Sequence, residues 1–462
     1  MKKSLVALAT LAAATGAFAQ SPNARAITGS NVEIFGVMDM AVTRVSASNG
    51  GSFTIMDGVG RNESTRLGFR GVEDMGGGWG AGFWLEAGLN IDNGTGANTT
   101  INNTANGDRV AFNQTSSPTM PTATLGARQG ITFNRASTVS LIGKDVGEIR
   151  LGRDYAATFW NYTTYDPFGT VGVGSALNVI GSPLAPLGTQ AFPPGAAYPM
   201  VRTSNAISWL SNNMNGFRAQ IQYALAEQGT DCVTPSTAVN ANTCWGASGD
   251  GKLAGFRLQY NNGPLSAALA NTKTSYGNVA AATAPTAAVT GGTAGTGAVA
   301  ASDLGNTAAI RGDYTVTNLG AAYTMGATKL MVQSHSQIQA ASGAASEKKL
   351  TGTLLGVAHT MGALTLKLSV NNAKRGDGST LVTGAAASSN ENGSKISQNA
   401  VGFVYDLSKR TALYGTYAKS TTTAGAASGG ALRSTLVWNG PAIAAGQSNS
   451  STGMDIGIRH RF

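Results

Sequence analysis

The chain has 462 residues, of which 42% are hydrophobic and only 12% are charged, and its formal net charge is +9. The charged share is about half of the 25% that is typical of soluble globular domains. Disordered chains are rich in charge and poor in apolar residues, so the composition argues against disorder. A bundle of membrane helices needs apolar runs of about 20 residues, and none follows residue 20. The mean hydropathy of −0.03 fits the remaining membrane class, the transmembrane β-barrel, whose strands each have an apolar and a polar face.

The first nineteen residues have the three parts of a secretory signal. Lys2 and Lys3 form a basic start, residues 5–14 are apolar, and Ala17-Phe18-Ala19 is a small-residue cleavage site. This order is typical of a signal peptide. We therefore expect residues 1–19 to be removed and residues 20–462 to form a single exported domain. Loss of the two lysines lowers the net charge from +9 to +7.

The two cysteines, Cys232 and Cys244, lie close together in a polar stretch. In an oxidising compartment they are expected to form a disulfide that staples a short loop, with a redox role as the less favoured interpretation. The chain has no C-x-x-C motif and no His/Cys cluster of the kind that zinc requires. The sequence predicts neither a metal nor a cofactor.

Apolar residues recur with a period of two rather than 3.6. Residues 364–370 read Leu-Thr-Leu-Lys-Leu-Ser-Val, and residues 217–223 and 256–260 alternate in the same way. In a strand, this alternation places apolar side chains on one face and polar side chains on the other. Segments of about ten such residues, separated by turn residues, are the signature of a membrane barrel.

Tight connections rich in Gly and Asn alternate with long polar ones. The seven tight turns fall at residues 74–78, 143–147, 212–216, 261–264, 324–328, 360–363 and 407–410. The eight long loops fall at residues 46–62, 92–129, 156–200, 228–250, 276–313, 341–347, 375–394 and 421–452. Fifteen connections imply sixteen strands. An even number of strands with short turns at one end and long loops at the other is what a bacterial outer-membrane barrel requires.

The predicted fold is therefore all-β, a 16-stranded antiparallel transmembrane β-barrel. In chain order, its strands are expected at residues 31–45, 63–73, 79–91, 130–142, 146–155, 201–212, 215–227, 251–261, 264–275, 314–325, 328–340, 348–361, 363–374, 395–407, 410–420 and 453–462. Lipid offers no hydrogen-bond partner, so the sheet must close to pair its two edges. A barrel of this size is too wide for side chains to fill, and water enters it.

Four stretches of the chain resemble one family. The chain ends in Gly457-Ile-Arg-His-Arg-Phe462, with apolar residues at alternate positions before it. Residues 32–39 (VEIFGVMD) and 64–78 (STRLGFRGVEDMGGG) match the family's first strand, second strand and first turn, and residues 147–153 (GEIRLGR) followed by 165–169 (YDPFG) match its fifth strand and constriction loop. In this order they resemble the trimeric general porins of beta-proteobacteria.

The resemblance implies a homotrimer of barrels in the Gram-negative outer membrane, with the termini on the periplasmic side. It implies that the third long loop, at about residues 156–200, folds into the lumen and narrows it. It also implies that the terminal residues, with His460 and Phe462, form the signal read by the barrel-assembly machinery. The expected partners are this machinery, outer-membrane lipids, and small hydrophilic solutes and ions.

Strand parity predicts which charged side chains face the pore. Arg66 and Arg70 in the second strand alternate with apolar residues, as does Arg150 in the fifth, so all three are expected to face water. Arg153 has lipid-facing parity, but it lies where the chain leaves for the constriction loop and is expected to turn inward. Two carboxylates, Asp154 and Asp166, are placed in the constriction. The same parity predicts further luminal side chains: Arg218, Arg257, Lys329 and Lys367.

A cluster of arginines in a narrow aqueous pore raises the local concentration of anions. We therefore expect passive diffusion of small hydrophilic solutes with a preference for anions. A substrate-specific channel is the alternative, since a line of exposed aromatic rings would suit sugars.

Other classes of protein fit less well. The only histidines are His335, His359 and His460, and none has a recognisable catalytic partner pattern, so the chain is not expected to be an enzyme. A surface adhesin would suit the Gly/Ala/Thr-rich loops but not the apolar strand faces or the terminal Phe. Nucleic-acid binding is not expected, because the basic residues are dispersed and the chain is exported.

Overall fold

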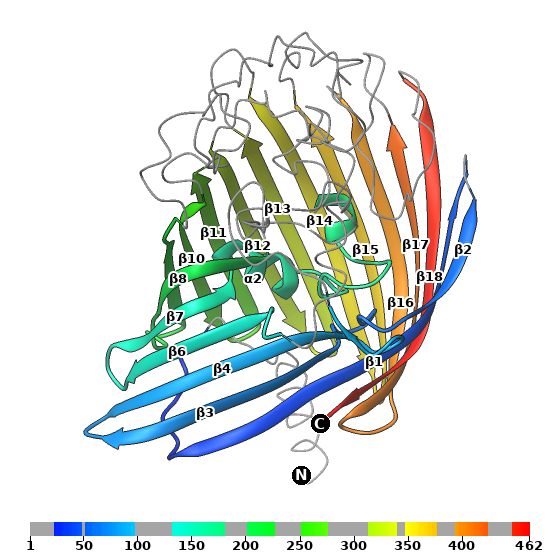
Figure 1. The fold of residues 1–462 in the computed structure, drawn as a ribbon. Helices are drawn as coiled ribbons and strands as arrows, with labels where there is room; N and C mark the ends of the chain where they lie inside the picture. The colour runs from blue at the N-terminus through cyan, green and yellow to red at the C-terminus, as the bar shows by residue number, and fades with distance from the viewer. Residues whose placement is uncertain are drawn as a thin grey trace, which may run out of the picture.

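The computed structural model describes residues 23–48, 51–97, 132–180, 201–226, 251–275, 313–339, 347–376, 393–423 and 446–462. Their strands pair antiparallel, and the last strand pairs with the first, so the sheet closes into a cylinder. Figure 1 shows its tilted strands, with the blue strands β1, β3 and β4 crossing in front of the yellow and orange ones. The sixteen-stranded barrel predicted from the sequence is confirmed.

Sixteen strands build the wall of the barrel. Their bounds are β1 (Asn31–Ala47), β3 (Arg66–Gly76), β4 (Trp79–Asn90), β6 (Ala136–Gly143), β7 (Gly147–Tyr155), β8 (Arg202–Leu210), β9 (Phe217–Ala224), β10 (Lys252–Asn262), β11 (Leu265–Ser275), β12 (Tyr314–Met325), β13 (Thr328–Gln339), β14 (Lys348–Met361), β15 (Leu364–Arg375), β16 (Lys395–Asp406), β17 (Thr411–Thr423) and β18 (Ser448–Arg461). Two short strands, β2 (Ser52–Asp57) and β5 (Thr95–Gly96), pair with β1 and β4. The labelled helices are α2 (Ala157–Thr164) and α3 (Leu177–Ile180). No helix in the described ranges is long and apolar enough to cross a membrane.

Strand β2 was not predicted, since it lies in the stretch 46–62 that was expected to be a loop. It forms because β3 pairs only with residues 31–37 of β1, which leaves the second half of that edge open. Residues 52–57 cover this open edge by pairing with residues 41–46, which satisfies backbone groups that would otherwise lack partners.

Strands β17 and β18 extend further into the stretch 421–452 than the sequence predicted. β17 runs to Thr423, and β18 begins at Ser448 rather than at residue 453. Serine, threonine and asparagine occupy both faces of these extensions. The alternation of apolar and polar residues therefore marks only part of each strand, and the estimate from sequence was too short.

The alternation along the strands separates the two faces of the wall. On β15, Leu366, Leu368 and Val370 expose 44%, 51% and 38% of their surface, whereas Ser369 and Asn371 are each 1% exposed. The exposed apolar side chains form the outer surface of the cylinder, and the buried polar ones point into it. Hydrocarbon is the environment that such an outer surface requires.

The barrel closes where β1 meets β18. The N–H of Gly36 donates to the carbonyl oxygen of Phe462, and the N–H of Phe462 donates to the carbonyl oxygen of Gly36, both at 3.1 Å. A Cβ at residue 36 would collide with the ring of Phe462. The terminal aromatic ring therefore lies over a residue without a side chain at the closing seam.

The chain after β7 turns into the barrel, and α2 packs against β10, β11 and β12 (Figure 1). The Asn161 side-chain amide donates to the carbonyl oxygen of Ala268 at 3.1 Å and to Oδ1 of Asn318 at 3.0 Å. Gln333 of β13 donates from Nε2 to the carbonyl oxygen of Asn161 at 2.8 Å. Polar side chains of the inner wall thus bind this loop, so residues 156–180 fold inward as predicted. The rest of the predicted constriction loop lies outside the described residues.

Residues 165–168 of this loop rest on inward-facing glycines of three strands. The ring of each of three side chains lies against one glycine: Tyr165 contacts Gly320 of β12, Pro167 contacts Gly356 of β14, and Phe168 contacts Gly402 of β16. A Cβ on any of these glycines would overlap the ring that lies on it. We call this row of three the glycine cradle. Larger residues there would leave no space for the loop.

Two carboxylates hold the loop in shape. Asp166 accepts hydrogen bonds from the backbone N–H groups of Phe168, Thr170 and Ala176 at 2.9, 3.1 and 2.8 Å. Burial raises the pKa of Asp166, while these N–H bonds act in the opposite direction. Asp455 of β18 accepts the N–H of Val173 at 2.7 Å. The loop is therefore bound to the closing strand as well as to the wall beneath it.

Replacing Gly320 by leucine should displace the loop. Overfilling a packed site costs roughly 1–3 kcal/mol, and the loop can move into water-filled space, whereas the strand cannot move. We expect Gly320→Leu to fold, to bind its loop less firmly, and to conduct with larger and noisier single-channel steps. The control is Gly51→Leu, because a Cβ at residue 51 meets nothing within 4 Å. Identical conductance in the two variants would contradict the role of the cradle.

Candidate functional site

One half of the inner wall, built from β3, β4, β6 and β7 and adjoining chain, carries a dense cluster of charged side chains that we call the arginine wall. Among the described residues this set contains seven arginines and five carboxylates, a difference of two positive charges, and Glu63 also pairs with Arg459 and Arg461 of β18. The arginines are Arg25, Arg66, Arg70, Arg135, Arg150, Arg153 and Arg202, and the carboxylates are Glu33, Glu63, Glu86, Glu148 and Asp154.

Arg70 is the more exposed of the two arginines predicted on β3, with 34% of its side chain accessible. Its Nε donates to Oε2 of Glu33 at 2.6 Å. Its guanidinium lies 5.0 Å from the ring centres of both Phe35 and Trp84, a distance at which a cation is attracted to an aromatic face. These rings orient Arg70 and leave part of it open to a passing solute.

Arg150 is only 3% exposed and is held by two carboxylates of its own strand. Its Nε and Nη2 donate to the two oxygens of Glu148 at 2.9 and 3.1 Å. Its Nη1 lies 3.4 Å from Oδ2 of Asp154. The paired contacts with Glu148 have the bidentate geometry that fixes a guanidinium firmly. Arg150 therefore acts on ions mainly through its field.

Arg66 is also buried, at 5% exposure. It pairs with Glu63, and its Nε lies 3.9 Å from Oε1 of Glu86. The same oxygen of Glu86 accepts a hydrogen bond from Arg135 and one from the hydroxyl of Tyr155 at 3.2 Å. Arg66 and Arg135 thus share the buried carboxylate of Glu86, and Glu63 is a second partner of Arg66, so these four charges balance one another.

A β-bulge redirects Arg153. The register between β7 and β8 shifts between Gly152 and Asp154, and Gly152 has a φ of +126° that favours glycine. Arg153 then donates from Nε to the carbonyl oxygen of Asn134 and from Nη1 to Oγ of Ser204, both at 2.6 Å. It therefore binds protein atoms at the start of the constriction loop, as the deviation from parity suggested.

The basic residues predicted on the opposite half of the wall contact the loop or lie beside it. Arg257 donates from Nε to Oδ1 of Asn161 at 2.8 Å, so it anchors α2. The Nζ of Lys367 lies 5.8 Å from the ring centre of Phe168. Arg218 and Lys329 point inward and are partly exposed.

Three arginines of the wall were missed by the sequence reasoning. Arg135 precedes β6, and Arg202 begins β8, with its guanidinium 5.0 Å from the Tyr155 ring centre. Parity gives no guidance at strand ends, where the chain bends. Arg25 precedes the first strand altogether, and no local pattern marks it as luminal.

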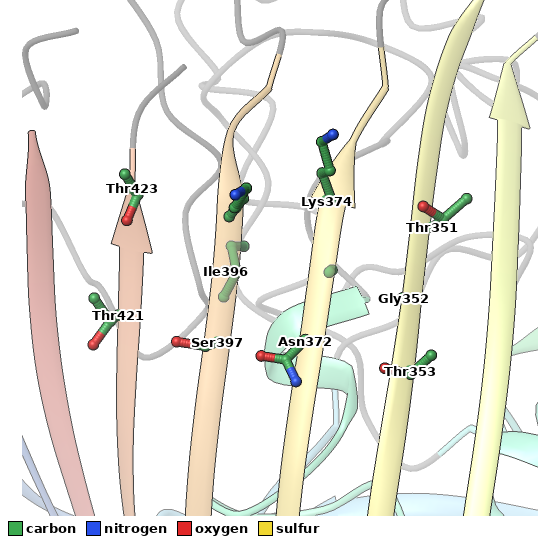
Figure 2. A pocket seen from close by; sticks show the side chains of 11 residues that line it. Thr351, Gly352, Thr353, Asn372, Lys374, Ile396, Ser397, Thr421 and Thr423 are labelled. Atoms are coloured by element: carbon green, nitrogen blue, oxygen red, sulfur yellow. The ribbon is translucent and has the colours of Figure 1, made fainter. Parts of the chain in front are cut away.

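Figure 2 shows a hollow of about 370 Å³ across β14 to β17. Its polar side chains, such as Thr351, Lys374 and Ser397, alternate with buried inward-facing residues such as Leu350 and Ala373. The hollow therefore opens on the outer face of the barrel and is separate from the lumen.

Two remaining sequence predictions concern cysteines and metals. Cys232 and Cys244 lie outside the described residues, so their disulfide stays a prediction. Within the part of the chain that the structure describes, no group of three or more His, Cys, Asp or Glu residues could hold a metal ion.

The arginine wall and the loop bound to the facing half line one closed cylinder. Charges in a low-dielectric wall focus their field into the water between them. An ion that passes through the lumen would be attracted or repelled by this field. The arrangement suits diffusion and charge selection.

Comparison with known proteins agrees with this geometry. The model of the family described as Gram-negative porin matches residues 4–425. The chain is 31% identical to outer membrane porin protein 32 of Delftia acidovorans over the full length of both chains. It is 26% identical to an outer membrane porin protein of Bordetella pertussis over 58% of each chain. These relatives are named as porins rather than as enzymes.

Solved structures show the same fold. An anion-selective porin from Comamonas acidovorans superposes with a TM-score of 0.62 at 27% identity, covering 94% of this chain and all of that one. OmpT of Vibrio cholerae superposes with a TM-score of 0.54 at 11% identity, over 95% of this chain and all of that one, and supports the fold alone. The closed sixteen-stranded barrel, its inward loop and the family match together establish that this chain belongs to the Gram-negative porins of the outer membrane.

Proposed function

We propose that this porin is a water-filled diffusion channel that prefers anions over cations, and that the arginine wall sets the preference. The observation that carries the proposal is the unbalanced positive charge of that wall, seven arginines against five carboxylates. The relative from Comamonas acidovorans is described as anion-selective, which supports the same sign of selectivity here.

Within this proposal the predicted arginines have different roles. Arg70, which is partly exposed, contacts passing anions, whereas Arg66 and Arg150 contribute through their field because both are largely buried. Arg153, Asp154 and Asp166 hold the shape of the constriction. Arg218 and Lys329 add luminal charge, and Arg257 and Lys367 stabilise the loop.

A substrate-specific channel is less well supported. Such a channel for sugars needs a line of exposed aromatic rings along the pore. In the described part of the chain Trp84 faces inward but is only 5% exposed, and Trp79, at 44% exposure, lies at a turn. Trp160 of α2 is buried at 3% exposure, and Trp79 and Trp209 have outward parity on β4 and β8, so none of the described tryptophans exposes its ring to the lumen.

The selectivity proposal is tested by reversal potentials in a KCl gradient. The wild-type channel should favour chloride, and the triple variant Arg66→Gln, Arg70→Gln, Arg150→Gln should lower the chloride-to-potassium permeability ratio by roughly tenfold or more, since each of the three charges is worth on the order of 1 kcal/mol in a narrow pore. The preference should weaken at high salt, because the Debye length falls from about 10 Å at 0.1 M to about 3 Å at 1 M.

The control for this experiment is Arg44→Gln. Arg44 is exposed on β1, between the inward-facing Thr43 and Val45, so this variant removes one arginine charge from outside the lumen. It should keep the wild-type permeability ratio. A wild-type channel that favours potassium would overturn the proposal.

We also propose that residues 1–19 are removed as a signal peptide and that the mature chain assembles as a homotrimer in the outer membrane. Gly457 to Phe462 would present the terminal signal to the barrel-assembly machinery. The apolar outer face described above supports residence among lipids, and the family match supports the trimer.

The trimer predicts a defined mass in mild detergent. Light scattering, corrected for bound detergent, should give three chains per particle, and boiling in denaturing detergent should convert it to single chains with a shift in gel mobility. A particle containing one chain before heating would contradict the proposed assembly without affecting the channel proposal.

A further inference from the structure

The segment before the first strand, residues 23–30, lies against the inside of the barrel. Ile27 packs against Gly80 of β4, where an added Cβ would be 3.2 Å from Cγ1 of Ile27, and Arg25 packs against Gly82 of the same strand. Both glycines share inward parity with the buried Trp84. The absence of side chains at these two positions leaves space for the segment within the lumen.

Arg25 is bound to this wall through both its backbone and its side chain. Its backbone N–H donates to Oε2 of Glu148, and its Nε donates to Oε1 of the same residue, both at 2.8 Å. Its Nη1 donates to the carbonyl oxygen of Phe83 at 2.9 Å, and its Nη2 donates to Oγ of Ser140. Glu148 and Ser140 both belong to the inward-facing rows of β7 and β6.

The segment also reaches Arg150. Nη2 of Arg150 donates to the carbonyl oxygen of Asn23 at 3.1 Å. Arg25 and Arg150 therefore share Glu148, and Arg150 also lies 3.4 Å from Asp154. With Arg25 present, this group of four charges is neutral. Without it, two carboxylates face one arginine, and the group is net negative.

We propose that residues 23–30 are a lumen-lining element and that Arg25 is a determinant of ion selectivity, because it cancels the charge of Glu148 and so preserves the positive excess of the arginine wall. The proposal rests on the channel function given above. It assigns to the N-terminal segment two effects that can be separated: the segment occupies part of the lumen, and its one arginine shifts the permeability ratio toward anions.

The electrostatic effect is tested with Arg25→Gln, with Arg25→Lys and Arg44→Gln as controls, in planar bilayers under a KCl gradient. Arg25→Gln should lower the chloride-to-potassium permeability ratio by roughly two- to fivefold, because it exposes one negative charge in the pore. Arg25→Lys keeps the charge and should stay close to wild type, as should Arg44→Gln, whose charge lies outside the lumen. An unchanged ratio in Arg25→Gln would overturn the assignment of Arg25.

The steric effect is tested with two variants that act on the segment itself. Removing residues 23–29 should increase the single-channel conductance, and Gly82→Leu, which fills the space beneath Arg25, should displace the segment and reproduce both the larger conductance and the lower permeability ratio. Wild-type conductance in the deletion variant would place the segment outside the lumen and overturn the inference.

These outcomes are distinct from those that test the proposed function. The sign of the wild-type preference decides whether the channel favours anions. The direction of the shift in Arg25→Gln is defined whatever that sign is, since the variant always removes one positive charge. A wild-type channel that prefers cations, combined with a further shift toward cations in Arg25→Gln, would refute the anion preference and support the role of Arg25.

Discussion

The structure depends on one constraint: within lipid, every backbone N–H and C=O group must find its partner in the protein. Closing the sheet through β1 and β18 meets this constraint, and β2 meets it where β3 leaves the edge of β1 open. A closed sheet then has only two surfaces, and side chains alternate between them. The apolar surface of residues such as Leu368 and the polar, charged interior are both consequences of this closure.

Most charged side chains inside the barrel are paired with a side chain of opposite charge. Arg66 and Arg150 are buried and paired, because an isolated charge in a low-dielectric wall would be costly. Pairing does not remove their influence, since loss of either arginine would leave its carboxylate partners unpaired in the wall. The wall produces a positive field without leaving many mobile side chains in the passage, and Arg70 is the predicted arginine that solutes reach most directly.

The strands, and the inward direction of arginines within them such as Arg66 and Arg150, were predictable from the sequence. Both follow from the alternation of apolar and polar residues along a strand that has lipid on one face and water on the other. Parity gives no guidance at positions where this rule does not operate. Gly152 shifts the register of β7 and redirects Arg153, and β2 forms in response to an edge that another strand leaves open. The glycine cradle was equally invisible, since Gly320, Gly356 and Gly402 lie on three separate strands and become one surface only when the barrel closes.

Glycines on the inner face leave space for two segments of the chain inside the lumen. In a sheet, glycine weakens the strand and offers no packing surface, so its presence at inward positions needs a compensating contact. Tyr165, Pro167 and Phe168 supply that contact on one half of the wall, and Arg25 and Ile27 supply it on β4. The wall thus admits two segments of its own chain: both narrow the pore by their volume, and the N-terminal one also brings the charge of Arg25 to it. Both segments take up space in the lumen, each held where strand residues lack side chains, whereas the charge of the N-terminal segment comes from Arg25 alone, so a substitution at Arg25 can alter pore charge while the segment stays in place.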